Sequence, residues 1–87
     1  MTPETPRLHV DQSLDIRGVA SPEGYHRAVE RLREMAEREV LELSLDDGES
    51  LRTIPFGLRA EGHEILVSEP ANNNGVRLFV RKRAPVT

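Results

Sequence analysis

Leu14-Asp15-Ile16-Arg17-Gly18-Val19-Ala20-Ser21-Pro22-Glu23-Gly24 is the stretch that decides the fold, because it leads from the first predicted strand into the first predicted helix. Leu14 and Ile16 alternate with polar residues, which indicates extended structure. Ser21 is a good N-cap, Pro22 suits the first helical position, and Glu23 favours the positive end of the helix dipole. The stretch therefore predicts a strand, a turn at Arg17-Gly18 and a helix.

The first helix is predicted by apolar residues that recur at spacings of three and four, namely Tyr25, Ala28, Val29, Leu32, Met35 and Ala36. The pairs Glu23/Arg27 and Glu34/Arg38 lie four residues apart on the solvated side, where opposite charges stabilise a helix. We expect this helix to end near Arg38 or Glu39.

The middle of the chain predicts a strand, a turn and a second helix. Residues 40–45 alternate leucines with polar residues, as a half-buried strand does, and Asp46-Asp47-Gly48 forms the turn. The second helix is expected over residues 49–61 and to stop at Gly62. Because proline loses a hydrogen bond inside a helix, we expect a kink or restart at Pro55.

Two further strands complete the chain, at residues 64–69 and 76–81, and the short loop between them predicts a hairpin. The order is β-α-β-α-β-β. Two helices can cover only one face of so small a sheet, so we predict an α/β (α+β) two-layer sandwich with a mixed four-stranded sheet. Residues 8–83 form the single domain, with flexible segments at 1–7 and 84–87.

Composition restricts the function. The formal net charge is -3, which does not favour nucleic-acid or membrane binding. The chain shows neither an apolar run long enough to span a bilayer nor a signal peptide, so a cytoplasmic protein is expected. It contains no cysteine, which excludes disulfides, thiolate metal sites and thiol catalysis in this chain.

The opening stretch resembles the signature of the TusA/SirA family of small sulfur-carrier proteins, which typically reads Leu-Asp-x-x-Gly-x-x-Cys-Pro-x-Pro. Further matches follow in order at the acidic turn, in the second helix, at the entry to the third strand and in the last strand: Asp46-Asp47-Gly48, Thr53-Ile54-Pro55, Gly62-His63-Glu64 and Arg77-Leu78-Phe79-Val80-Arg81-Lys82. The resemblance covers about residues 8 to 83 and implies the same two-layer fold.

The chain departs from this signature at two positions. Ser21 aligns with the family's sulfur-carrying cysteine, and Gly24 aligns with its second proline. A serine hydroxyl cannot hold a persulfide, so this chain is not expected to carry sulfur. Two histories remain open: natural divergence, or a cysteine-to-serine replacement in a carrier. Gly24 favours divergence, because a single replacement would not also remove the proline.

Three functions therefore compete. The first is a thiol-less module that binds a partner protein, by resemblance a cysteine desulfurase or another relay or regulatory protein, through Arg17, Ser21, Pro22 and Glu23. The second is a sulfur carrier, as in tRNA thiolation or sulfur oxidation, whose catalytic cysteine has been replaced by Ser21. The third is an RNA- or anion-binding module that uses the basic and aromatic residues Arg77, Phe79 and Arg81.

The positions of the histidines and acidic residues along the chain disfavour serine hydrolysis and metal binding. His9, His26 and His63 are dispersed, and no acid is placed to form a triad with Ser21. Asp46, Asp47 and Glu49 are more typical of a solvated cap than of a cation site. We therefore expect no cofactor and no metal, and a monomer rather than an oligomer.

Overall fold

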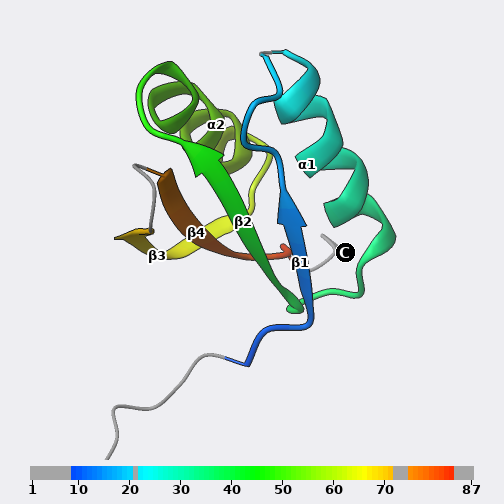
Figure 1. The fold of residues 1–87 in the computed structure, drawn as a ribbon. Helices are drawn as coiled ribbons and strands as arrows, with labels where there is room; N and C mark the ends of the chain where they lie inside the picture. Colours follow the sequence, from blue (N-terminus) through cyan, green and yellow to red (C-terminus); the bar gives the residue numbers. More distant parts are fainter. Residues whose placement is uncertain (1–8, 21, 72–74, 84–87) are drawn as a thin grey trace, which may run out of the picture.

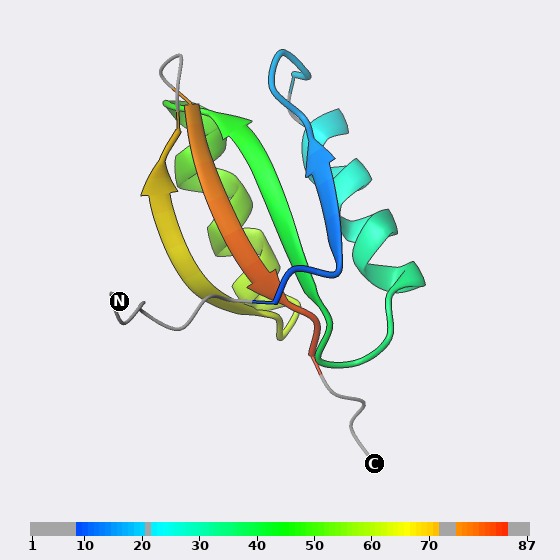
Figure 2. The ribbon, with the colours of Figure 1, turned by 60° about the horizontal axis from the view of Figure 1, so that its bottom comes forward.

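The computed structural model describes residues 9–20, 22–71 and 75–83. Its elements follow the predicted order: β1 (Gln12–Asp15), α1 (Glu23–Glu34), β2 (Val40–Asp46), α2 (Glu49–Ala60), β3 (Glu64–Pro70) and β4 (Gly75–Arg81). The strands form one sheet in the order β1-β2-β4-β3. Both helices lie on the same face of this sheet (Figure 1, Figure 2), so the predicted two-layer sandwich is confirmed.

The strand pairing makes β2 the central strand. β1 runs parallel to β2, with Leu14 opposite Leu43, and β4 runs antiparallel to β2, with Leu78 opposite Leu43. β3 and β4 form the predicted antiparallel hairpin. The sheet is therefore mixed, as predicted.

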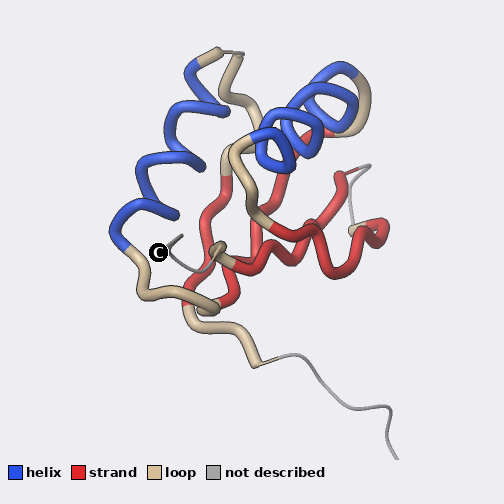
Figure 3. The backbone as a smooth tube through the Cα atoms, turned by 180° about the vertical axis from the view of Figure 1, so that it is seen from behind, coloured by secondary structure: helices blue, strands red, loops and turns tan. Residues whose placement is uncertain are grey.

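The core lies between the sheet and the two helices. Leu41, Leu43 and Leu45 of β2 have no exposed surface, and Val80 and Leu78 of β4 are buried to 0% and 1% exposure. The helices contribute Ala28 and Leu32 from α1 and Ile54 and Leu58 from α2. Seen from the helix side, α1 and α2 cover the sheet together (Figure 3). None of the helices in the described part of the chain is long and apolar enough to cross a membrane.

α1 is shorter than predicted, because it ends at Glu34 rather than near Arg38 or Glu39. Met35 is extended, with ψ 156°, and Arg38 has φ 71°. Arg38 and Lys82 are joined by a backbone hydrogen bond of 3.0 Å, and Lys82 donates in turn to the Glu39 carbonyl at 2.8 Å. Pairing with the end of β4 therefore replaces the last helical turn, and the predicted Glu34/Arg38 pair across that turn is wrong.

α2 runs continuously through Pro55, so the predicted restart is wrong. Pro55 and its neighbour Ile54 are buried, which indicates that packing against the sheet outweighs the hydrogen bond that proline cannot make. The end of α2 is as predicted. Gly62 has φ 98°, its N–H donates to the Arg59 carbonyl at 2.9 Å, and the N–H of His63 donates to the Leu58 carbonyl at 3.1 Å. These bonds form a Schellman motif.

The two helices approach each other closely where Tyr25 of α1 lies against Gly57 of α2. A Cβ atom at position 57 would lie 2.6 Å from Tyr25 Cε1, which is closer than non-bonded atoms allow. Gly57 therefore provides the space that the tyrosine ring occupies.

We predict that Gly57→Ala destabilises the protein. The substitution gains up to about 1 kcal/mol of helix propensity, but crowding against Tyr25 costs about 1–3 kcal/mol. Urea denaturation measures the net effect, and Tyr25→Ala supplies the control. In that background the same substitution should stabilise, because no ring opposes the new methyl group. Equal effects in the two backgrounds would contradict this interpretation.

Candidate functional site

The loop between β1 and α1 is held from the neighbouring strand. Gly18 has φ 81°, a conformation that favours glycine, and its N–H donates to Asp46 Oδ2 at 2.7 Å. Asp46 is the last residue of β2, and β2 lies parallel to β1. The carboxyl ends of these two strands are therefore joined by a charge-assisted hydrogen bond.

Asp15 and Arg17 form a compact ion pair at the end of β1. Arg17 donates through Nη2 to Asp15 Oδ2 at 2.8 Å, and through Nε and the backbone N–H to Oδ1 at 3.0 Å each. These side-chain hydrogen bonds are the main reason why the pKa of Asp15 falls from 3.8 to about 2, and they raise the pKa of Arg17. Both side chains are substantially exposed. The pair therefore orients Arg17 while leaving it accessible.

α1 begins at Glu23, with Pro22 in the N-cap position and no side-chain cap bond. The predicted start at Pro22 is thus one residue too early. Ser21, and with it the predicted cap, lies outside the described residues. Backbone bonds close the first turn: Gly24 donates to the Ala20 carbonyl at 3.1 Å and His26 donates to the Pro22 carbonyl at 3.0 Å. The predicted Glu23–Arg27 ion pair forms at 3.0 Å.

Next to this loop is an open depression of about 550 Å³, lined by Gly18, Val19, Ala20, Asp46, Asp47, Glu49 and Ser50. Its carboxylates are partly engaged in local bonds, since Asp46 binds Gly18 and Asp47 binds the Gly48 N–H at 2.8 Å. Within residues 9–20, 22–71 and 75–83, no group of three or more His, Asp or Glu residues is arranged to hold a metal ion.

The three histidines lie apart. His26 is exposed on α1 close to the loop, whereas His9 contacts Asp11 at 2.9 Å before β1 begins. His63 lies at the far end of α2, where its Nδ1 accepts the backbone N–H of Arg83 at 3.2 Å. The structure therefore does not bring these histidines together.

The basic residues of β4 are paired with carboxylates on the open face of the sheet. Arg77 contacts Glu69 at 3.0 Å and Glu42 at 3.5 Å, and Arg81 contacts Glu64 at 2.9 Å. Phe79 lies between them on the same strand and is half-buried. Because both cations are already balanced, this face offers little net positive charge to a nucleic acid.

Two features of the site were missed from the sequence. The Gly18–Asp46 bond joins residues that are distant along the chain. The helix that joins the first two strands favours their parallel pairing, which places their carboxyl ends side by side. Asp46 could therefore have been identified as a neighbour of the loop. The bidentate Asp15–Arg17 pair was also missed, because only its local geometry reveals it.

Comparisons with known proteins agree with this architecture. The family model described as "Sulfurtransferase TusA" matches residues 12–82. A "Putative sulfur carrier protein" of Archaeoglobus fulgidus is 28% identical over 80 residues, which cover 92% of this chain and 91% of the relative. The crystal structure of a SirA-like protein of Desulfitobacterium hafniense superposes with a TM-score of 0.73 at 18% identity, covering 84% of this chain and 99% of that one. The structural likeness shows the shared fold.

We predict that the carboxyl of Asp15 titrates with a pKa of about 2 in the native protein and moves back towards 3.8 in Arg17→Ala. Since the folded pKa lies below the ordinary value, the pair stabilises the protein above pH 3.8, and this contribution is lost as the pH falls through about 2. Carboxyl carbon NMR measures the titration. Arg27→Ala, which removes a different ion pair, should leave Asp15 unchanged. An unaltered titration in Arg17→Ala would contradict the assignment.

Proposed function

This chain belongs to the TusA family of sulfurtransferases, and on that basis we propose that it is a member without a thiol, which binds a partner protein and does not itself carry sulfur. The absence of cysteine from all 87 residues carries this proposal. The fold and the loop of a carrier are retained, whereas the group that would hold the sulfur is not.

The chemistry of sulfur transfer explains why the thiol matters. An acceptor thiolate attacks the terminal sulfur of a donor persulfide, a new S–S bond forms as the donor's S–S bond breaks, and the donor leaves as a thiolate. A serine hydroxyl stays protonated near neutral pH unless a base activates it. Its oxygen also cannot form the S–S bond. Ser21 therefore removes sulfur acceptance from this chain.

A binding role is supported by the way the loop is held. The Asp15–Arg17 pair, the Gly18–Asp46 bond and the Gly24–Ala20 bond fix its two ends. Residues that are already held in place lose less conformational entropy on binding. Pro22 and Glu23 are exposed beside it. We assign partner contact to Arg17, Ser21, Pro22 and Glu23.

Gly24 supports natural divergence rather than a laboratory replacement. Its N–H donates to the Ala20 carbonyl, and a proline at this position could not make that bond. The change from the family pattern is therefore accommodated by the local backbone. The proposal expects a serine codon at position 21 of the gene. A cysteine codon would instead make this chain a blocked sulfur carrier.

We take the partner class from the resemblance to sulfur carriers. One relative is described as a "Putative sulfur carrier protein". For this chain the resemblance implies a cysteine desulfurase as the partner. We predict that the wild-type chain binds a cysteine desulfurase and that Arg17→Ala weakens binding by about tenfold, the effect of losing about 1.4 kcal/mol. Biolayer interferometry measures the affinity. Arg33→Ala, at the far end of α1, is the matched control and should bind normally. Equal losses in both variants would contradict the assigned surface.

We also predict that Ser21→Cys accepts sulfur from the desulfurase, because the scaffold around position 21 is that of a carrier. Intact-protein mass spectrometry under non-reducing conditions detects the added sulfur atom. The wild-type chain should gain none. Ser68→Cys, which places a thiol at an exposed position of β3, is the control for unspecific transfer. If Ser21→Cys gains no more sulfur than Ser68→Cys, the loop has lost its relation to sulfur donors.

A further inference from the structure

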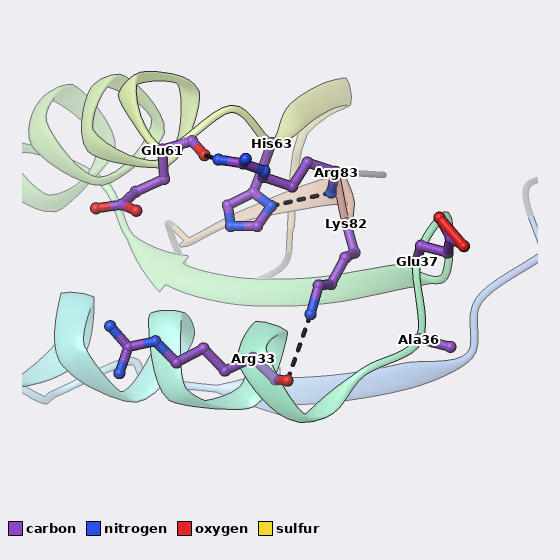
Figure 4. Close-up of a pocket in the computed structure, with 7 residues that line it drawn as sticks. All are labelled: Arg33, Ala36, Glu37, Glu61, His63, Lys82 and Arg83. Atoms are coloured by element: carbon purple, nitrogen blue, oxygen red, sulfur yellow. Dashed lines mark hydrogen bonds between the residues drawn. The ribbon is translucent and has the colours of Figure 1, made fainter. Parts of the chain in front are cut away.

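A second hollow lies at the end of the sheet away from the β1–α1 loop, between the C-terminal ends of the two helices (Figure 4). It has a volume of about 620 Å³ and is lined by Arg33, Ala36, Glu37, Glu61, His63, Lys82 and Arg83. β1 and β4 run in opposite directions, so the residues that follow β4 lie far from the loop. This pocket is thus separate from the proposed partner surface.

Two cations of the pocket bind the carbonyls at the helix ends. Lys82 Nζ donates to the carbonyls of Met35 at 3.0 Å and Arg33 at 3.3 Å, at the end of α1. Arg83 Nη1 donates to the Glu61 carbonyl at 2.8 Å, at the end of α2. Cations in this position stabilise the negative ends of helix dipoles. This capping fixes the place of both side chains.

Capping does not use all the donors. Lys82 Nζ has one N–H beyond the two carbonyl bonds, and the Arg83 guanidinium has four beyond the one to Glu61. Over the described ranges 9–20, 22–71 and 75–83, no carboxylate lies within 4.0 Å of either cation. Unlike Arg77 and Arg81 on the sheet, these charges are not balanced by ion pairs in this part of the structure.

His63 adds a neutral donor. Its Nδ1 accepts the Arg83 N–H at 3.2 Å, so the ring proton is on Nε2. Figure 4 shows the imidazole ring of His63 directed into the hollow, which Glu61 also lines. Burial lowers the pKa of His63, the positive charges of Lys82 and Arg83 lower it further, and the carboxylate of Glu61 raises it. Three cations (Arg33, Lys82 and Arg83) and two carboxylates (Glu37 and Glu61) line the pocket, so its lining carries an excess of one positive charge, which favours an anion.

We propose that this pocket binds a small phosphate-bearing molecule, whose phosphate oxygens accept hydrogen bonds from Lys82, Arg83 and His63. The guanidinium and ammonium of the segment after β4 and the imidazole N–H of the segment after α2 line the same hollow, and such a set of donors matches an anion with several oxygens. The volume exceeds that of a single phosphate ion and leaves room for the rest of the molecule. This pocket is separate from the proposed partner surface. An experiment can therefore contradict one of the two proposals without affecting the other.

The test follows His63 by NMR while inorganic phosphate, ribose 5-phosphate or acetate is added to the full chain at constant ionic strength. Phosphate and ribose 5-phosphate should shift the resonances of residues 63, 82 and 83 and raise the pKa of His63, because the bound anion favours its protonated form. Tighter binding of ribose 5-phosphate identifies a phosphorylated small molecule. Tighter binding of inorganic phosphate would overturn that part of the proposal. Acetate should bind at least tenfold more weakly.

Variants separate a binding site from a structural cap. Arg83→Gln and His63→Gln should each weaken phosphate binding by about tenfold, whereas Arg59→Gln, an exposed position on α2, should not change it. His63→Gln retains a side-chain acceptor for the Arg83 N–H, which limits damage to the fold. Absence of a localised shift in the wild-type chain, or equal binding by all three variants, would overturn the proposal.

Discussion

The burial of three leucines on the central strand β2 is the constraint on which the rest of the structure depends. Leu41, Leu43 and Leu45 are completely buried, and each contributes about 1.5–3 kcal/mol through the apolar surface removed from water. A shift of β2 by one residue would turn all of them to the open face of the sheet. The register of β2 with β1 and β4 is therefore fixed. This register also fixes where the β1–α1 loop and the segment that follows β4 leave the sheet.

Helices on only one face require a solvated sheet on the other. There the arginines of β4 face carboxylates of β2 and β3, so that the charges cancel locally. Such cross-strand pairs suit a surface exposed to water. The two candidate sites lie instead at the two ends of the sheet, where chain segments leave the strands. One end has the β1–α1 loop, and the other has the pocket formed by Lys82, Arg83 and His63.

The sequence predicted those elements whose side chains repeat with a clear period. The alternation in β2 predicted which of its residues face the core. The positions of Pro22 and Gly62 predicted the start of α1 to within one residue and the end of α2. Periodicity failed where a distant segment decides the conformation. The apolar spacing continues past Glu34, but the backbone there pairs with Lys82.

Candidate site residues could be predicted from the sequence where they belong to one continuous motif. The loop was found from its resemblance to a signature, whereas the bond from Gly18 to Asp46 depends on how two strands pair. The far pocket could not be predicted, because its residues come from α1 and from the segments that follow α1, α2 and β4. Only the assembled sheet brings them together.

The proposed loss of the thiol is compatible with the way in which the loop is held. Its hydrogen bonds join Asp15 to Arg17, Gly18 to Asp46 and Gly24 to Ala20, and none of them uses a side chain at position 21. Exchanging a thiol for a hydroxyl at that position therefore removes the sulfur chemistry but none of these bonds. Under the proposed function, partner binding and sulfur transfer are therefore separable properties, because they depend on different groups of the loop.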